Sequence, residues 1–326
     1  MTNLRDDLLK IDVAGETDRI VSAIREQVFK QLKRKGVVLG LSGGIDSSVV
    51  ASLAVKALGN DRVLGLLMPE EESSAESLRL GRLIAEHLGV KTVLEDITPV
   101  LNAAGCYRRR DEAIRTVIPE YGIGYKCKIG LPDIKQRDRY NIFSLIVQSP
   151  AGVEIKARLT AEAYLAIVAA TSFKQRTRKM MEYYHADRHH YAVAGTPNRL
   201  EYDQGFFVKN GDGAADLKPI AHLYKTQVYQ IAEYLGVPEE IRQRPPTTDT
   251  YSLHQSQEEF YFSMPYDKMD LCLHGKNHQI PAVDIVAVTG LSPEQIERVY
   301  RDIESKRRAT RYLHLRPLLV EGVYEV

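Results

Sequence analysis

Residues 37–50 read VVLGLSGGIDSSVV. The first five residues are apolar and partly β-branched, which favours a short buried strand, whereas residues 47–59 have the pattern of a helix that ends at a glycine. A Ser-Gly-Gly turn between a strand and a helix directs backbone N–H groups toward a small concavity at the positive end of the helix dipole. The stretch therefore predicts an anion site at the end of a strand.

Asp46 lies inside this turn, although a carboxylate repels phosphate. A cation that bridges carboxylate and phosphate oxygens would resolve the conflict, and Mg²⁺ prefers one or two carboxylates plus ligand phosphates. The loop lacks the Gly-Lys-Ser/Thr ending of a Walker A motif and is not Gly-x-Gly-x-x-Gly. The alternative is a Ser/Gly turn that only caps the helix.

The rest of the chain alternates between helical and strand patterns, and the strands are apolar throughout. This pattern predicts an α/β fold: a doubly wound, Rossmann-like parallel sheet with helices on both faces. A Ser73 cap with Glu76 three residues later predicts the start of one helix. The predicted helices are 17–34, 47–59, 73–89, 160–187, 225–236 and 292–309, and the predicted strands are 37–41, 62–68, 91–97 and 191–195.

Residues 101–160 interrupt the alternation. Two extended stretches flank the Ser-Pro-Ala-Gly sequence at 149–152, so the segment predicts an insertion that contains a hairpin. With no internal repeat and no low-complexity linker, we expect residues 1–326 to form one domain.

Composition excludes several classes of protein. Lys plus Arg (44) nearly balance Asp plus Glu (43), giving a net charge of +1 that disfavours a protein that coats nucleic acid or an anionic membrane. No run of about 18 apolar residues is present, and the first ten residues lack a signal-peptide pattern. Three scattered cysteines, Cys106, Cys127 and Cys272, predict neither a disulfide framework nor a thiolate metal site. A cytoplasmic enzyme without membrane or nucleic-acid partners is the expectation.

The Ser-Gly-Gly-Ile-Asp-Ser loop resembles the pyrophosphate loop of ATP pyrophosphatases, and residues 195–228 resemble the signature of ammonia-dependent NAD synthetases. In the latter, Gly-Thr-x-Asn-x-x-Glu precedes Gly-Phe-Phe-x-Lys-x-Gly-Asp-Gly-x-Ala-Asp and a Lys-Thr pair. The resemblance implies amidation of deamido-NAD with ammonia, ATP as co-substrate, Mg²⁺, and an adenylated carboxylate with AMP and pyrophosphate as products. It also implies a homodimer, and a separate glutaminase could supply the ammonia. Another amide ligase of the same superfamily, acting on a different acid, is the alternative.

The resemblance assigns residues to four roles. Asp46 and Lys225 are the implied catalytic residues, and Asp46 and Glu201 the implied metal ligands, a pair that would repel without a cation between them. The implied substrate contacts are Arg176, Lys209, Asp216 and Lys306. The implied ATP site comprises Gly40, Leu41, Ser42, Gly43, Gly44, Ile45, Asp46, Ser47, Ser48, Thr196, Lys225 and Thr247.

Plainer interpretations stay open for several of these residues. Glu201 could lie in a surface loop, Lys209 and Asp216 in a solvated turn, and Lys306 in a basic tail. Lys174, Arg176 and Lys179 could form one solvated helix face.

Three other features bear on these assignments. Either the insertion or the 205–213 loop could cover the site as a lid. His185 and His189 lack a third ligand spaced for zinc. Cys272 near His274 is more typical of a small buried side chain than of a nucleophile.

Overall fold

A parallel four-stranded sheet forms the centre of the computed structural model, which describes residues 8–130, 143–247, 250–253, 255–256, 258–262 and 264–323. All of its neighbouring strands pair in parallel. In spatial order the strands are β3 (Lys91–Leu94), β2 (Val63–Leu67), β1 (Val37–Gly40) and β7 (Ala192–Val193).

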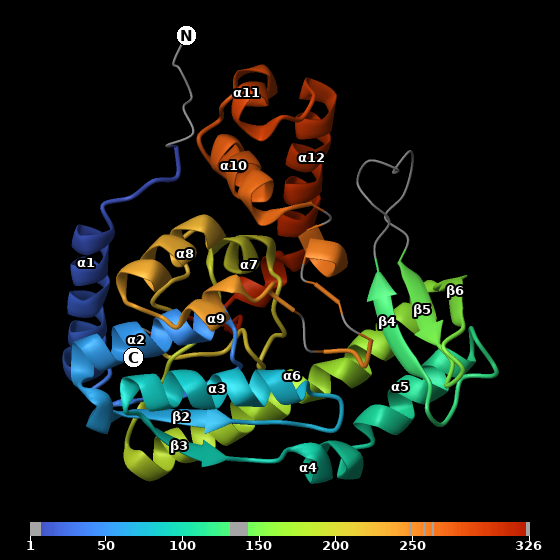
Figure 1. Ribbon diagram of the computed structural model, residues 1–326, viewed down its shortest axis with the longest axis horizontal. Coiled ribbons are helices and arrows are strands. Elements are labelled where there is room, and N and C mark those ends of the chain that lie inside the picture. The colour runs from blue at the N-terminus through green and yellow to red at the C-terminus, as the bar shows by residue number, and fades with distance from the viewer. Residues whose placement is uncertain are drawn as a thin grey trace.

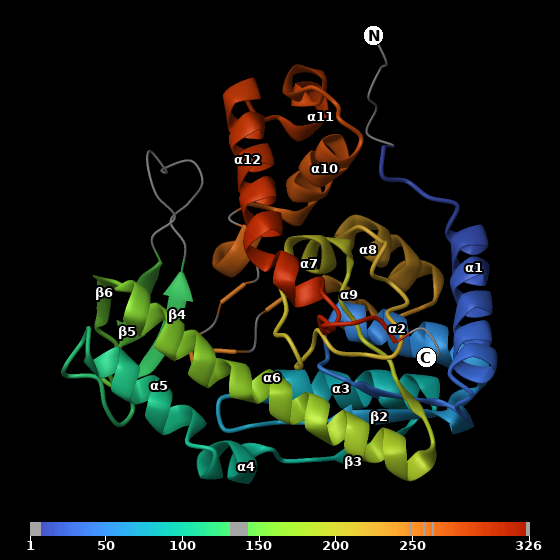
Figure 2. The same cartoon turned by 180° about the vertical axis from the view of Figure 1, so that it is seen from behind.

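Helices cover both faces of this sheet (Figures 1 and 2) because alternate strand residues point to opposite sides. Val37 and Leu39 pack on one face against α1 (Val13–Glu26), α2 (Ile45–Leu58), α3 (Ala75–Leu88) and α8 (Lys225–Tyr234). Val38 and Leu66 pack on the other face with α4 (Thr98–Ala103), α5 (Cys106–Arg115) and the long α6 (Ala161–His189). The predicted doubly wound α/β fold is confirmed.

The strand order reverses at β1. The chain moves outward from β1 to β2 and β3, then returns through α6 to place β7 on the other side of β1. Loops after two such strands diverge and leave a crevice at their carboxyl ends, where open α/β sheets bind ligands. The 41–44 loop follows β1, and residues 194–198 follow β7, so both face this crevice.

The 101–160 segment is more regular than its sequence predicts. It includes the second half of α4, all of α5 and a separate antiparallel sheet of β4 (Lys126–Gly130), β5 (Ser144–Gln148) and β6 (Glu154–Arg158). The hairpin about 149–152 is confirmed, whereas helices α4 and α5 and strand β4 were missed; residues 131–142 lie outside the described residues. One face of this sheet buries Cys127, Leu145 and Val147 in a core shared with α5 and α6.

The C-terminal half adds helices around α8, which Figure 1 places above the sheet, and most of these helices share a second core. They begin with α7 (Arg199–Gln204) and end with α12 (Pro293–Thr310) and the 3₁₀ turn η6 (Arg311–His314). Between them lie α9 (Glu239–Gln243), the π-helical turn η4 (Glu258–Phe262), α10 (Tyr266–Asn277), the 3₁₀ turn η5 (Ala282–Asp284) and α11 (Val286–Thr289).

Several helix and strand ends differ from the sequence prediction; β7, for example, is only Ala192–Val193 where 191–195 was predicted. The first helix starts at Val13, not residue 17, because Asp12 caps it by accepting from the Gly15 N–H, and its last part is the π-helical turn η1 (Gln27–Gln31). The cap of α3 is Ser74, whose side chain accepts from the Ser77 N–H. Ser73 instead accepts from the Glu70 N–H, so the predicted Ser73 cap is wrong. Strand β3 is shorter than predicted and ends at Leu94.

Candidate nucleotide-binding site

The loop between β1 and α2 has the geometry of an anion site. Gly43 has a φ of +73°, and a Cβ there would lie 2.5 Å from the Ser77 carbonyl oxygen, so only glycine fits. Gly44 is the N-cap of α2 but offers no side chain for capping. The Ser47 and Ser48 hydroxyls donate to the Gly44 carbonyl at 3.1 and 2.8 Å. The first N–H groups of α2 therefore face the crevice without a side-chain cap, as an anion site requires.

Asp46, in the first turn of α2, contacts residues from two distant parts of the chain. Its Oδ2 atom accepts a short hydrogen bond from the Lys225 ammonium, and its Oδ1 atom accepts from Asn198 Nδ2 at 3.1 Å. Asn198 also caps α7 in a reciprocal capping box with Glu201: Asn198 Oδ1 accepts from the Glu201 N–H at 3.2 Å, and Glu201 Oε2 from the Asn198 N–H at 3.0 Å. One asparagine thus ties the two predicted metal ligands to each other.

The cluster of Asp46, Glu201 and Lys225 has two acidic side chains and one basic side chain. Burial raises the pKa of Glu201 to about 8, and the charge of Asp46 adds to the effect. Lys225 is fully buried; burial lowers its pKa, but Asp46 and Glu201 together outweigh that effect and raise it. One ammonium therefore serves two carboxylates, which is a suitable donor set for a divalent cation.

Lys225 is placed by a residue that the sequence analysis missed. It begins α8, and its backbone N–H donates to Asp270 Oδ1 at 3.2 Å while the Thr226 N–H donates to Oδ2 at 2.7 Å. Asp270 belongs to α10, is fully buried, and has a pKa that burial raises to about 7. Because it lies 45 residues from Lys225, no local pattern pointed to it.

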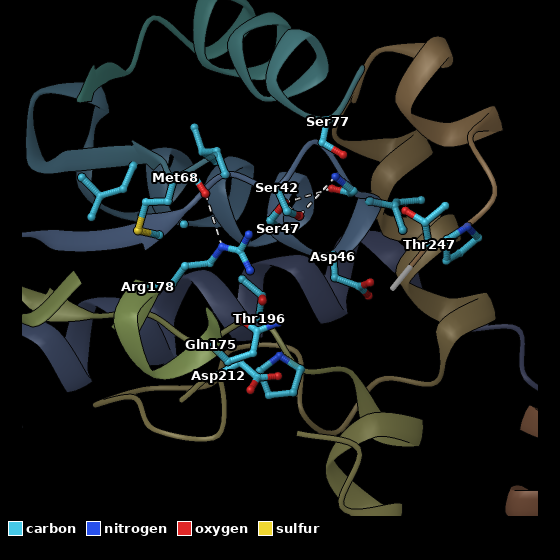
Figure 3. A pocket seen from close by; sticks show the side chains of 18 of the residues that line it. Ser42, Asp46, Ser47, Met68, Ser77, Gln175, Arg178, Thr196, Asp212 and Thr247 are labelled. Carbon is cyan, nitrogen blue, oxygen red and sulfur yellow. Dashed lines mark hydrogen bonds between the residues drawn. The ribbon is translucent and has the colours of Figure 1, made fainter. Parts of the chain in front are cut away.

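These groups border a pocket of about 260 Å³. Gly40, Leu41, Ser42, Gly44, Ile45, Asp46 and Ser47 line it on one side, and Thr196, Glu201, Lys225 and Thr247 line it elsewhere. Figure 3 shows Asp46, Thr196 and Thr247 around the same space. Two residues of the predicted ATP set are buried beside it: Ser48 in α2, and Gly43 where the loop packs on α3.

The pocket also holds charged residues that the sequence analysis did not select. Arg178 reaches into it from α6, with Nε 3.3 Å from the Met68 carbonyl oxygen, as Figure 3 shows. Arg244 lines the far edge and donates to Ser77 Oγ at 2.9 Å. Lys179 pairs with Glu182 at 2.6 Å, and both are buried. The spacing of 175, 178, 179 and 182 is the signal that could have revealed one helix face turned toward the site.

The solvated-face interpretation of α6 is therefore wrong for Lys174 and Lys179, which are 1% and 5% exposed. Arg176, by contrast, is exposed. A helix rotates about 100° per residue, so neighbours in one basic segment point to different environments.

The four predicted substrate contacts are not gathered in this pocket. Arg176 Nε donates to the Lys209 carbonyl at 3.3 Å, so these two lie together. Asp216 Oδ2 accepts from the Val193 N–H at 2.7 Å, and Lys306 pairs with Asp302 at 2.8 Å. The structure thus brings the ATP residues and the predicted metal ligands together, and two of the four substrate residues.

Cys272 and His185, the remaining candidates, have surroundings typical of structural residues. Cys272 is fully buried, and burial raises the pKa of its thiol to about 12, which opposes thiolate formation. His185 contacts Glu95 at 2.7 Å. Among the described residues, no group of three or more His, Cys, Asp or Glu side chains could hold a metal ion, and no helix is long and apolar enough to cross a membrane.

A phosphate-binding loop at the switch point of a parallel sheet, with two carboxylates and a lysine beside it, defines a nucleotide-binding α/β protein. The family model for NAD synthase matches residues 16–117 and 145–311, and the chain belongs to that family. The family model leaves residues 118–144 unmatched, within the predicted insertion.

Relatives and solved structures agree with this assignment. The chain is 62% identical over 312 residues to the NH(3)-dependent NAD(+) synthetase of Mesorhizobium japonicum, covering 96% of this chain and 98% of that protein. In fold it is similar to an NH3-dependent NAD synthetase from Campylobacter jejuni (TM-score 0.62, 23% identity, 95% of this chain and 100% of that one). It is equally similar to an NMN synthetase from Francisella tularensis (TM-score 0.62, 22% identity, the same coverage). The fold therefore does not distinguish between these activities.

Proposed function

We propose that this chain catalyses the ATP-dependent amidation of deamido-NAD with ammonia, giving NAD, AMP and pyrophosphate. The observation that carries the proposal is the meeting of Asp46, Glu201 and Lys225 at a phosphate loop, in a member of the NAD synthase family. The 62% identity to a protein named NH(3)-dependent NAD(+) synthetase supports the choice of substrate and ammonia source.

In this mechanism the nicotinate carboxylate attacks the α-phosphorus of ATP and pyrophosphate leaves. Ammonia then attacks the acyl carbon of the adenylate, and AMP leaves with the bonding electrons. Both partners of the first step are anions, so the protein must hold them in line and offset their charge. The first N–H groups of α2, the Lys225 ammonium and the Arg178 guanidinium are the groups that we assign to this task.

Mg²⁺ fits the donor set, because Asp46 and Glu201 are two carboxylates that share one ammonium. When bound, the ion would neutralise phosphate charge and orient the oxygens of the triphosphate. Within this proposal, Asp46 and Glu201 would hold the ion, and Lys225, now bonded to Asp46, would bind phosphate.

Arg176, Lys209, Asp216 and Lys306 stay proposals as deamido-NAD contacts. The Arg176–Lys209 contact supports the first two, since it places a guanidinium beside the loop that follows α7. The proposal also treats residues 1–326 as one domain, which in the cytoplasm forms a homodimer and takes ammonia from a separate glutaminase. Sedimentation tests the dimer.

The test of function is pyrophosphate release from ATP by the purified chain, with Mg²⁺, ammonium and one candidate acid at a time. Deamido-NAD should support turnover, whereas nicotinate, nicotinate mononucleotide, aspartate and citrulline should not, since truncated acids lose the remote contacts that position the carboxylate. A faster rate with another acid would replace the NAD synthetase assignment with the alternative ligase.

The nitrogen donor is tested in the same assay. Ammonium should support NAD formation, and pure glutamine should not, because the buried Cys272 thiol does not serve as a glutaminase nucleophile. Equal rates with glutamine would contradict this.

A further inference from the structure

A buried ionic cluster includes two carboxylates of the loop 69–74, part of which lines the pocket. The residues of this cluster have no role in the mechanism proposed above. Lys174 of α6, 1% exposed, donates from Nζ to Glu70 Oε1 at 2.9 Å and to Glu72 Oε2 at 2.6 Å. Arg110 of α5, 4% exposed, donates to both oxygens of Glu72 at 2.6 Å. The Tyr107 hydroxyl donates to Glu70 Oε2 at 2.6 Å.

The two buried cations of this cluster, Lys174 and Arg110, pair closely with the carboxylates of Glu70 and Glu72. Burial by itself raises the pKa of Glu72, but the charges of Lys174 and Arg110 outweigh it and hold that pKa below its ordinary value. Removing one partner of a buried pair leaves an uncompensated charge and is strongly destabilising. Glu70 and Glu72 lie in the loop after β2, whose Pro69, Ser73 and Ser74 line the pocket.

The third contact of Lys174 connects this loop to another part of the pocket. Its ammonium also donates to the Thr250 carbonyl at 2.9 Å. Thr250 lies in the turn between Thr247, which lines the pocket, and Ser256, with which Thr247 forms an antiparallel bridge. One ammonium therefore joins the two segments that flank the pocket.

The antiparallel sheet of the insertion supports the same turn. The Leu253 N–H donates to the Cys127 carbonyl at 3.1 Å, the Cys127 N–H donates to Ser252 Oγ at 2.9 Å, and Gln255 Nε2 donates to the Ile129 carbonyl at 2.6 Å. Strand β4 therefore supports the Thr247 turn, and Lys174 connects the same turn to the loop after β2.

We propose that Lys174 is a positioning residue for the nucleotide pocket: it holds the turn that carries Thr247 at a fixed distance from the loop 69–74. The inference rests on the proposed function in one respect, that ATP occupies this pocket. Lys174 does not touch the reacting atoms; its loss leaves the chemical groups in place but lets the Thr247 side of the pocket move.

The test compares Lys174→Met with Arg110→Met by calorimetric titration with ATP and by thermal unfolding. Each variant deletes one buried cation of the same cluster, but of these two cations Lys174 is the one that donates a hydrogen bond to a described residue of the turn, Thr250. Both should lower Tm. Kd for ATP should rise by about 10-fold in Lys174→Met, because ATP binding must then order the turn that Lys174 no longer holds, and by less than about 3-fold in Arg110→Met. Equal increases in Kd would overturn the proposal.

A second variant covers the case in which Lys174→Met does not fold. Lys174→Met with Glu70→Gln keeps the buried charge balanced but still lacks the donor to Thr250. It should recover stability without recovering ATP affinity; recovery of both would show that Lys174 is only structural. In the amidation assay, KM for ATP should rise more than kcat falls.

Failure of the proposed function gives a different result from failure of this inference. A wild-type chain that binds ATP but makes no NAD from deamido-NAD would overturn the function alone, and the Kd comparison would still decide the role of Lys174. A wild-type chain that does not bind ATP would overturn both.

Discussion

The crevice at the ends of β1 and β7 and the region around the 205–213 loop were both predicted from sequence motifs, but they differ in the structure. At the crevice, Asp46, Asn198 and Lys225 meet directly, although 152 and 179 residues separate Asp46 from its partners. Around the loop, the polar groups bond to the protein itself: Lys209 Nζ donates to the Tyr312 carbonyl at 2.9 Å, and Lys306 Nζ to the Tyr261 carbonyl at 2.7 Å. At the crevice these side chains lie at the starts of α2, α7 and α8, which pack at the end of the sheet, whereas a loop fixes a side chain only through contacts that a ligand can replace.

The largest expected effect tests the crevice. Asp46→Asn keeps the size of the side chain but removes the charge opposite Lys225, so adenylation should fall by at least about 10²-fold. Pyrophosphate release measures it. Asp12→Asn, in the N-cap of α1, is the matched control and should leave the rate unchanged. A wild-type rate in Asp46→Asn would show that Asp46 is only a structural partner of Lys225 and Asn198.

Arg176→Ala tests the other region. If the exposed guanidinium binds deamido-NAD, its loss should lower kcat/KM for that substrate by roughly 10- to 10²-fold, the range for a charge-assisted contact, with Kd for ATP unchanged. Steady-state kinetics measures the first and calorimetry the second. Arg108→Ala serves as control, since Arg108 is exposed on α5 and pairs with Glu112. Unchanged kinetics in Arg176→Ala would remove it from the substrate site.

Asp270→Asn tests how the C-terminal helices support the crevice. Burial raises the pKa of Asp270 from 3.8 to about 7, so between these values the folded chain binds more protons than the unfolded chain. Asp270 should therefore stabilise the folded chain at low pH, and this contribution to the free energy of unfolding should be lost as the pH rises through this range. Asp270→Asn should reduce that loss, as measured by urea unfolding at pH 4 to 8, whereas Asp267→Asn, exposed on the same helix, should not.

The smallest effect concerns the N-cap of α3, where the sequence analysis predicted Ser73 and the structure shows Ser74. Ser74→Ala should lower the free energy of unfolding by about 1 kcal/mol, because Ser74 caps α3. Glu76→Gln should have almost no effect, since Glu76 is not the partner of the cap. Chemical denaturation distinguishes the two, and an equal loss in both would restore a cap that involves Glu76.

Most of the fold could be predicted because its signals are local. The apolar run before Ser42, the glycines at the turn and the four-residue recurrence of α1 each reflect a backbone or burial requirement that acts within one element. The insertion was harder to predict. Its β4 strand pairs with β5 across residues 131–142, and the buried side of α5 includes Arg110, whose charge hides the apolar stripe that would mark a helix.

The sequence by itself determined the anion loop, the parallel sheet and the family signature, since these depend on residue type and spacing along a short stretch. Only the tertiary structure decided where buried charged groups find their partners. Asp270 accepts from the backbone N–H of Lys225, and Lys174 donates to the backbone carbonyl of Thr250, across 45 and 76 residues. The physical reason is that a buried charged group must find hydrogen-bond partners in space, and the path of the chain between the two leaves no periodic trace in the sequence.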